Sequence, residues 1–204
     1  AYAKVEELLT PAEDRVRPPC PVFARCGGCQ LQHMAYRMQL RFKTALVRDT
    51  LKKLGGVTAE VSSCERSEAE YGYRNKLQLP IGTVNGKNIV GFYAERSHRI
   101  VDTDVCPIHP DWAAPLIAAV KKFMEKCGLD GYDEVTHEGQ LRHIVVRQLG
   151  KKFLITLVTA VRELKGIDYF LFLLDDIFPA YSFLLNFIDR DTNVVFGEEF
   201  QLLK

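Results

Sequence analysis

The amino-acid sequence predicts an α+β fold, in which helices pack on a mainly antiparallel sheet and an N-terminal cysteine-rich loop binds a metal. Three observations support this prediction. Two long stretches carry apolar residues at helical spacing, several short stretches have the apolar pattern of strands, and Asn85-Gly86 marks a tight hairpin. With 204 residues, of which 47% are hydrophobic, the chain is long enough to bury a sizeable core.

The periodicity predicts the elements in the order helix, hairpin, helix, hairpin, helix and strand. The expected ranges are 34–54 (helix), 73–79 and 89–93 (hairpin), 111–127 (helix), 141–148 and 153–159 (hairpin), 167–178 (helix) and 181–188 (strand). Gly55 and Gly128 follow the first two helices, where glycine commonly ends a helix. Asp111 is the expected N-cap of the second helix, because its carboxylate can accept a hydrogen bond from the first turn.

A cysteine motif precedes the first helix. Cys20, Cys26 and Cys29 form a C-x5-C-x2-C pattern, and two glycines between the last two cysteines allow the turn that aims both thiolates at one metal. Cys106 is the best candidate for a fourth ligand, because it follows a predicted strand and can return to the motif. Four thiolates suit zinc or an iron–sulfur cluster, and the residues alone leave both open.

The alternative to a metal site is a disulfide framework, although secreted scaffolds of that kind are usually shorter and denser in cysteine. The remaining cysteines, Cys64 and Cys127, are expected to be structural, because Cys127 lies on the apolar stripe of the second helix. His33 lies near Cys29 and is interpreted as a capping or supporting residue rather than a zinc ligand.

The charge is unevenly distributed along the chain. The formal net charge is only +1, yet residues 15–105 carry fifteen Lys and Arg against eight Asp and Glu. The half that contains most of the cysteines is therefore basic, which points to an anionic partner. A solvated charged surface is the alternative interpretation.

Within this basic half, cations recur at regular spacing. Arg37, Arg41, Arg48 and Lys52 share one face of the first expected helix, and no acid neutralises them at matching spacing. Further on, Arg74 and Lys76 share one face of an expected strand. Such stripes are either the wet side of an amphipathic element or a contact surface for phosphates.

Several function classes have no support in the sequence. No dinucleotide-binding or phosphate-binding glycine loop follows a strand, no nucleophile elbow occurs, and no complete active site is recognisable. No apolar run is long enough to span a membrane, and no secretory signal opens the chain. We therefore expect a cytoplasmic monomer without a membrane partner.

The cysteine motif with its surroundings, Cys20-Pro…Cys26-Gly-Gly-Cys29-Gln-Leu-Gln-His33, resembles the cluster-binding signature of the RNA uridine-C5 methyltransferases. These enzymes use S-adenosylmethionine to make 5-methyluridine in ribosomal or transfer RNA. The resemblance covers about residues 5–204. It continues through Tyr73-Arg74-Asn75-Lys76, Gly91-Phe92-Tyr93, Cys106-Pro107, Leu141-Arg142-His143 and Asn186…Thr192-Asn193…Gly197.

The resemblance implies three parts and a parent enzyme. Residues 1–19 would be a remnant of an N-terminal OB-like domain and linker, 20–185 a central RNA-binding domain, and 186–204 the start of the methyltransferase domain. The central domain would hold a [4Fe–4S] cluster on Cys20, Cys26, Cys29 and Cys106. The parent would be a 23S ribosomal RNA (uracil-C5)-methyltransferase whose methyl-donor loop and nucleophilic cysteine lie beyond Lys204, so these 204 residues alone should be inactive.

RNA is the partner that this resemblance implies for the basic half. The residues expected to contact it are Arg37, Arg41, Arg74, Lys76, Arg96, His98, Arg99, Arg142 and His143. For His143, a satisfied, half-buried histidine is the alternative. For the whole chain, the alternatives are a zinc-stabilised nucleic-acid-binding module without enzymatic activity and a small electron-transfer protein, whose cysteines are usually more tightly spaced.

Overall fold

The structure is a computed structural model that describes residues 5–190 and 194–204. The chain divides into two compact units, of which the first comprises Ala1–Phe23 and Cys29–Glu70 and the second Ala24–Gly28 and Tyr71–Lys204. The short segment Ala24–Gly28 thus belongs to a different unit from the residues on either side of it.

The first unit is built around one helix, α1 (Tyr36–Gly55), which confirms the first predicted helix. It ends at Gly56, whose left-handed backbone (φ 63°) lets its N–H donate to the Leu51 carbonyl. The N-terminal segment is tied to the residues that enter the helix. The N–H of Val16 donates to the His33 carbonyl at 2.9 Å, and the N–H of Ala35 donates to the Asp14 carbonyl at 2.8 Å.

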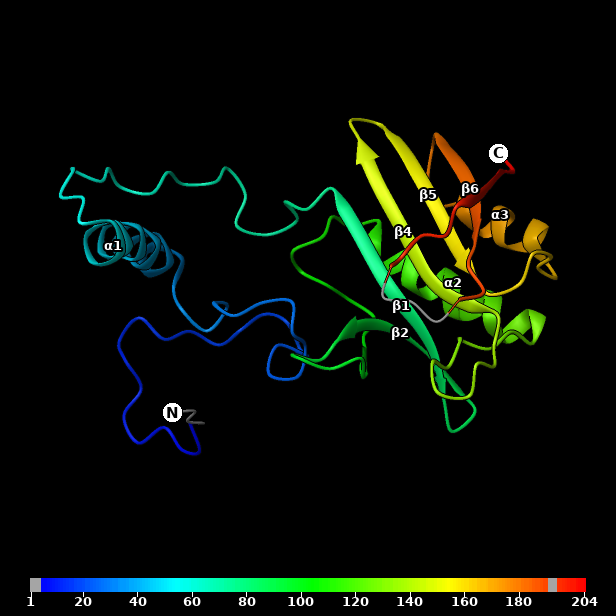
Figure 1. The fold of residues 1–204 in the computed structure, drawn as a ribbon, viewed down its shortest axis with the longest axis horizontal. Coiled ribbons are helices and arrows are strands. Elements are labelled where there is room, and N and C mark those ends of the chain that lie inside the picture. The colour runs from blue at the N-terminus through cyan, green and yellow to red at the C-terminus, as the bar shows by residue number, and fades with distance from the viewer. Residues whose placement is uncertain (1–4, 191–193) are drawn as a thin grey trace. The chain divides into compact units, whose positions relative to one another are not determined.

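The second unit is a seven-stranded sheet with two helices, and the strand order is β3-β2-β1-β4-β5-β6-β7 (Figure 1). Its elements are β1 (Lys76–Val84), β2 (Lys87–Tyr93), β3 (Ile100–Asp102), α2 (Ala113–Cys127), β4 (Leu141–Leu149), β5 (Lys152–Thr159), α3 (Ile167–Asp175), β6 (Tyr181–Phe187) and β7 (Glu199–Leu202). Only β5 and β6 pair in parallel, joined through α3; every other neighbouring pair in this order is antiparallel. The predicted α+β class with a mainly antiparallel sheet is confirmed.

The β1–β2 hairpin has the predicted turn. Asn85 and Gly86 both have left-handed backbones (φ 51° and 73°), and Val84 pairs with Lys87 directly after them. This two-residue turn matches the twist of its flanking strands, which explains why Asn-Gly is a reliable hairpin signal. The hairpin therefore fixes the register of β2. The predicted site residues Arg96, His98 and Arg99 follow the end of that strand.

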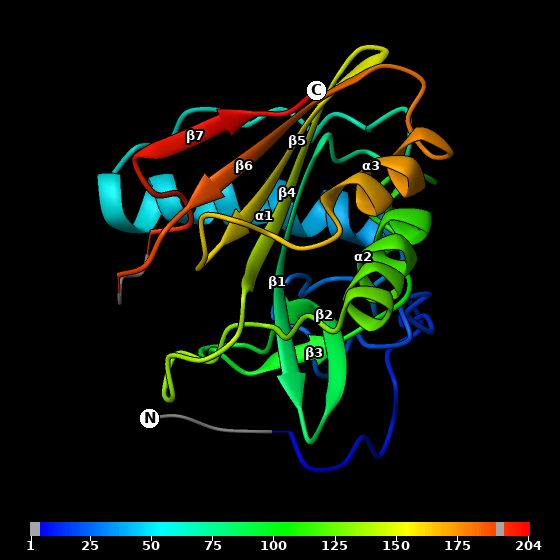
Figure 2. The same cartoon turned by 90° about the vertical axis from the view of Figure 1, so that its right-hand side faces the viewer.

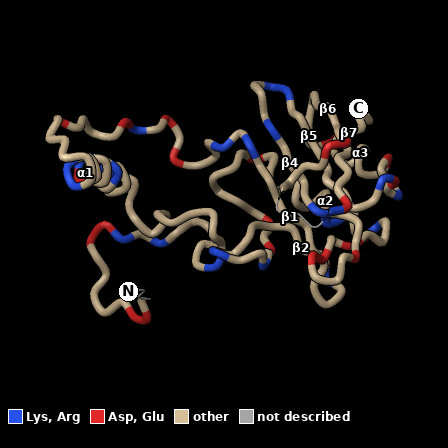
Figure 3. Tube along the Cα trace, in the orientation of Figure 1, with Lys and Arg blue, Asp and Glu red and all other residues tan. Residues whose placement is uncertain are grey.

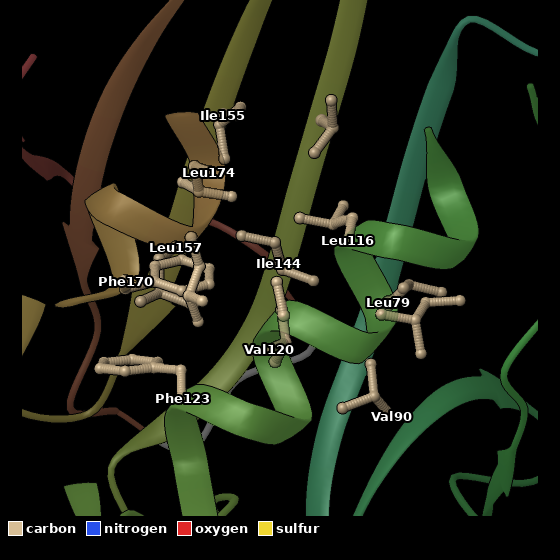
Figure 4. Packing of buried hydrophobic residues seen from close by; sticks show 14 of the residues in the cluster. Leu79, Val90, Leu116, Val120, Phe123, Ile144, Ile155, Leu157, Phe170 and Leu174 are labelled. Atoms are coloured by element: carbon tan, nitrogen blue, oxygen red, sulfur yellow. The ribbon is translucent and has the colours of Figure 1, made fainter. Parts of the chain in front are cut away.

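Helices α2 and α3 cover the same side of the sheet (Figure 2). Leu116 and Val120 of α2 pack with Leu79 and Ile144 from the sheet, as Figure 4 shows. The rings of Phe123 in α2 and Phe170 in α3 stack with centroids 4.7 Å apart, which joins the two helices. All six of these side chains are fully buried, so the apolar stripes predicted for the second and third helices form the core.

Several element boundaries differ from the predictions. The first strand begins at Lys76 rather than residue 73, because the N–H of Gly72 donates to Pro107 and the N–H of Arg74 donates to Ile108 in a loop before the sheet. The second helix begins at Ala113 with Trp112 as N-cap, and Asp111 makes no cap. The third helix ends at Asp175, three residues earlier than predicted.

Strand β7 was not predicted. Its sequence alternates, with Phe200 and Leu202 as the apolar positions, but the strand is only four residues long and all four are exposed. Among the described residues, no helix combines the length and apolar character that crossing a membrane requires.

Candidate nucleic-acid interface and cysteine motif

The middle of the cysteine motif is anchored in the second unit. The N–H of Gly27 donates to the carbonyl of Tyr93, the last residue of β2, at 3.0 Å. A Cβ at Gly27 would lie 2.9 Å from the Glu95 backbone, so only glycine fits this close approach. The next residue, Gly28, donates its N–H to the Cys26 sulfur at 3.4 Å. A backbone donor to sulfur favours the thiolate form that binds metals.

Cys106 has a defined polar neighbour in the same unit. The Nδ1 atom of His109 lies 3.1 Å from the Cys106 sulfur, and its Nε2 atom lies 3.0 Å from the Lys76 carbonyl. Because a carbonyl only accepts, Nε2 carries the ring proton. Burial lowers the pKa of His109, and the charge of Arg74 lowers it further, so the ring is neutral. Its Nδ1 therefore accepts a hydrogen bond from the Cys106 thiol.

In the first unit, the backbone around Cys20 is held by a buried side chain. The N–H of Cys20 donates to the Gln32 amide oxygen at 3.3 Å, and Gln32 is buried. The His33 ring lies beside the Phe23 ring, with centroids 5.8 Å apart. His33 thus packs locally, in keeping with the supporting role predicted for it.

The predicted ligand set is divided between the two units. Cys20 and Cys29 belong to the first, whereas Cys26 and Cys106 belong to the second. All four are partly buried. In the part of the chain that the structure describes, no group of three or more His, Cys, Asp or Glu side chains is arranged to hold a metal ion. The four-cysteine ligand set therefore stays a prediction.

The predicted cationic stripe on α1 is partly neutralised within its own unit. The Arg37 guanidinium pairs with the Asp14 carboxylate at 2.7 Å, and Arg48 lies 3.4 Å from Asp49. Helical spacing does not reveal these partners, because Asp14 comes from the preceding segment and Asp49 directly follows Arg48. Arg41 is exposed and forms no ion pair with any described residue. Lys and Arg positions recur along α1, as the blue segments of the trace in Figure 3 show.

Four predicted cations lie at the surface around the second unit's first strands. Arg74 is exposed just before β1, and Lys76 is the first residue of that strand, with its Nζ 3.1 Å from the Gln78 side chain. Arg96 and Arg99 lie exposed in the turn after β2. Arg96 is 3.7 Å from Glu95, a distance at which an exposed pair binds weakly. These cations remain open to phosphate contact.

Arg142 occupies a different kind of position. It is 5% exposed, and its guanidinium donates to the carbonyls of Ile188 (3.4 Å) and Arg190 (3.1 Å). The same group lies 4.2 Å from the centroid of the Tyr132 ring. Its Nη1 is thus committed to the backbone, and its burial does not favour the phosphate contact predicted for Arg142.

His143 is held neutral. Its pKa is lowered to about 4, chiefly by burial and further by the charge of Arg142. Its Nε2 atom lies 3.4 Å from the Tyr93 hydroxyl, and its Nδ1 atom is buried without a hydrogen-bond partner among the described residues. A neutral ring lacks the charge that attracts a phosphate, so the predicted phosphate contact does not suit His143 either.

Arg142, His143 and Tyr93 line a pocket of about 270 Å³ in the second unit. Its walls come from β1, β2, the start of β3, residues 132–135 and the start of β4. His98 lies on one wall, with its Nδ1 2.9 Å from a carboxylate oxygen of Glu134. The pocket thus contains four predicted residues, His98, Arg99, Arg142 and His143, beside Tyr93, Tyr132 and Glu134, which sequence reasoning did not single out as site residues.

The last fragment of the resemblance includes a structural anchor. Asn186 is fully buried, and its side-chain amide bonds to the backbone of Gly197 and Glu199. It thereby holds the segment that leads into β7 beside β6. Thr192 and Asn193, from the same fragment, lie outside the described residues.

Comparisons with known proteins agree on one class of enzyme. The chain is 43% identical, over 98% of its length, to an uncharacterized RNA methyltransferase of Clostridium tetani and covers 44% of that protein. It is 40% identical, over 99% of its length, to an uncharacterized RNA methyltransferase of Halalkalibacterium halodurans and covers 45% of it. No protein-family model matches.

A solved structure supports the same class. The tRNA (uracil-54, C5)-methyltransferase of Pyrococcus abyssi, in complex with S-adenosyl-L-homocysteine, matches 96% of the chain with a TM-score of 0.68 and 27% identity. The chain covers 43% of that protein. The chain therefore spans less than half the length of the curated relatives and of the structure that it matches.

Proposed function

We propose that this chain is part of an S-adenosylmethionine-dependent enzyme that methylates C5 of uracil in RNA, and that it supplies RNA contacts and a [4Fe–4S] cluster. The similarity across nearly the whole chain to proteins named RNA methyltransferases carries the proposal. The uracil-C5 specificity of the structural neighbour, which matches over 96% of the chain, supports the finer assignment. The target that the sequence resemblance implies is 23S ribosomal RNA. The neighbour acts on transfer RNA, which is therefore the substrate to test beside it.

The proposed division of the chain follows the same resemblance. Residues 20–185 form the central cluster-binding and RNA-binding part, after an OB-like remnant at 1–19 and before the start of a methyltransferase domain at 186–204. The methyl donor and the nucleophilic cysteine belong to the part of the relatives that this chain does not cover. We further propose that the enzyme acts as a cytoplasmic monomer without a membrane partner.

In this reaction, the proposed role of the chain is to bind the RNA around the target base. A cysteine adds to C6 of the target uracil, and C5 then takes the methyl group from S-adenosylmethionine, which leaves as S-adenosylhomocysteine. Loss of the C5 proton to a base and elimination of the cysteine from C6 restore the ring. The target base must first leave its stack, which costs a few kcal/mol that other RNA contacts offset. The exposed Arg74, Lys76, Arg96 and Arg99 in the second unit, together with Arg41 on α1, are the proposed phosphate contacts.

Cys20, Cys26, Cys29 and Cys106 are the proposed ligands of the cluster, which would act as a structural staple. One local feature supports this assignment, because the Gly28 N–H already donates to the Cys26 sulfur. Cys106 is partly buried, like the other three cysteines. Four cysteines also bind zinc, so a zinc-stabilised module is the second candidate. Visible absorption of anaerobically purified protein separates the two, because zinc is colourless.

The proposed reaction is tested with the full-length protein that contains this chain. Transfer of labelled methyl groups from S-adenosylmethionine to uracil C5 should occur in 23S ribosomal RNA, with transfer RNA assayed in parallel. The 204-residue chain, assayed under the same conditions, should transfer none. Absence of 5-methyluridine in both RNAs, with a folded and cluster-loaded protein, would overturn the proposal.

A further inference from the structure

We propose that the pocket lined by Tyr93, His98, Glu134 and His143 receives one unstacked base of the bound RNA. This inference rests on the proposed RNA binding and adds to it a place where the chain reads a base rather than the backbone. The residues around the pocket had been expected to contact phosphates. For Arg142 and His143 the geometry indicates a different ligand, whereas Arg99 at the same pocket stays a proposed phosphate contact.

The size of the pocket suits a single heterocycle. Its volume of about 270 Å³ is near the lower end of small-molecule pockets, which span about 300–1,000 Å³. Ile81, Ile89 and Ile100 provide apolar walls. A pocket with mostly apolar walls and a few polar groups is the usual environment of an aromatic ligand.

Aromatic rings offer the base a surface for stacking. The Tyr93 and His98 rings lie with centroids 5.5 Å apart and planes 31° apart, and the His143 ring meets the Tyr93 ring edge-on at 6.4 Å. Proteins that bind single-stranded RNA hold bases on aromatic side chains of this kind, because every base has a stacking face. His98 is fixed in place by its contact with Glu134.

The polar groups of the pocket suit a base edge better than a phosphate. His143 is neutral, and its Nδ1 atom is buried without a partner among the described residues, so the ring presents no charge to a phosphate. The Tyr93 hydroxyl is a second neutral group. Asp133 and Glu134 also line the pocket and would repel a phosphate. Arg142 commits its Nη1 to two backbone carbonyls and its guanidinium lies over the Tyr132 ring, while Arg99, an exposed cation, also lines the pocket.

The wall opposite the sheet is already fixed. A Cβ at Gly131 would lie 2.2 Å from the Gly82 backbone, so only glycine lets this loop approach β1. The Gly131 N–H donates to the Thr83 hydroxyl at 2.8 Å. The Asp133 carboxylate then accepts from the N–H groups of Val135 (2.7 Å) and Thr136 (3.0 Å). A preformed wall lowers the entropic cost of binding.

The test fills the pocket by a substitution at its exposed rim, so that the buried core of the second unit is unchanged. Val135 lines the pocket and is 87% exposed, so Val135→Trp adds a ring at the rim of a folded protein. Leu149→Trp is the matched control, because Leu149 is 66% exposed and does not line the pocket. His143→Phe keeps a ring and removes both nitrogens. Circular dichroism checks that each variant is folded.

Affinity is measured for two probes, a short single-stranded RNA of mixed sequence and the same ribose-phosphate strand without bases. For the RNA, Val135→Trp should weaken binding about 5- to 150-fold, the range for one stacked base, and His143→Phe should weaken it in the same direction. For the abasic strand, both variants should bind like the wild type. Leu149→Trp should change neither affinity.

The outcomes separate this inference from the RNA binding on which it rests. If the wild type binds RNA and both pocket variants bind it equally well, the base pocket is wrong and the RNA-binding proposal stands. If the variants lose affinity for the abasic strand as well, the pocket contacts the backbone and the inference is again wrong. If the wild type binds neither probe, the RNA-binding proposal itself fails.

Discussion

The two compact units differ in what holds each of them together. In the first unit, Val22 is the one buried hydrophobic side chain among the described residues, and α1 has no buried residue. Apolar residues of α1 such as Leu46 and Leu54 are 54% and 84% exposed. In the second unit, α2 buries seven residues against the sheet and α3.

The contrast shows that an apolar stripe predicts a helix but does not show that the helix packs into a core. Both helices have one in the sequence, and both form, but only α2 gains a core from it. Most helix stability in proteins comes from packing of an apolar face rather than from intrinsic propensity. The first unit therefore needs another source of stability. The proposed cluster is one such source, because two of its four ligands, Cys20 and Cys29, belong to this unit.

Removal of the cluster is expected to have the largest effect, and to affect the two units unequally. Replacing Cys20, Cys26, Cys29 or Cys106 by Ser should bleach the visible absorption, because each supplies one of four thiolates. Limited proteolysis should then cut the first unit rapidly while the second remains intact, since only the second has an extensive apolar core.

The two remaining cysteines provide the controls. Cys64→Ser and Cys127→Ser should keep the colour, because Cys127 packs against the core of the second unit and Cys64 lies in the segment after α1. Bleaching by either of these variants would show that the ligand assignment is wrong. Protection of α1 in cluster-free protein would show that the cluster is not what stabilises the first unit.

A single core substitution should reproduce the contrast between the units. Phe170 is fully buried and stacks on Phe123, so Phe170→Ala should lower the free energy of unfolding of the second unit by about 3–5 kcal/mol. Leu46→Ala on α1 should change stability by less than about 0.5 kcal/mol, because Leu46 is already half exposed. Urea denaturation of both variants measures this. Similar losses would mean that α1 is covered by an apolar partner in solution.

Periodicity and turn chemistry were enough to predict most of the second unit. The β1–β2 hairpin follows from Asn85-Gly86, and the β4–β5 hairpin follows from two apolar runs around a short polar turn. What the pattern missed has a physical cause. Strand β7 is only four residues long, and the N-cap of α2 lies at Trp112, which offers no side-chain oxygen.

The candidate site was less predictable, because a bulge changes which side chains are buried. The register of β4 against β5 shifts between Leu141 and His143, so the simple alternation of inward and outward residues fails there. Leu141 and Arg142 are consequently both buried, and His143 is partly buried and neutral. From the sequence, Arg142 and His143 were expected to contact RNA, with a satisfied, half-buried histidine as the alternative for His143. The sequence around Leu141 and His143 contains no pattern that predicts this bulge.

Acid should affect the second unit through His143. Its folded pKa of about 4 lies below the usual 6.5 of histidine, so the unfolded chain takes up a proton first as the pH falls. Above pH 6.5 the ring is neutral in both states and does not reduce the free energy of unfolding. As the pH falls from 6.5 toward 4, protonation of the unfolded chain lowers that free energy by up to about 3 kcal/mol. His143→Phe cannot take up this proton. The difference between its unfolding free energies at pH 7 and pH 4 should be smaller than in the wild type, and an equal difference would contradict this role of His143.

The smallest expected effect compares the RNA contacts of the two units. Removing one phosphate contact with single-stranded RNA should lower the log–log salt slope of binding by about 0.7. Arg74→Ala with Lys76→Ala should therefore lower it by about 1.4, because both side chains lie at the start of β1 without an acidic partner among the described residues. Arg37→Ala with Arg41→Ala should lower it by only about 0.7, because Arg37 is already paired with Asp14.

A matched pair in the second unit controls for loss of charge alone. Lys151→Ala with Lys152→Ala removes the same charge from the β4–β5 turn and should leave the slope nearly unchanged, since this turn is not among the proposed contacts. An equal fall in all three double variants would mean that RNA senses net charge rather than a defined surface. A fall for the α1 pair alone would place the phosphate contacts on the first unit. Unchanged slopes throughout would mean that these cations do not bind RNA, because released counterions are the direct measure of phosphate contact.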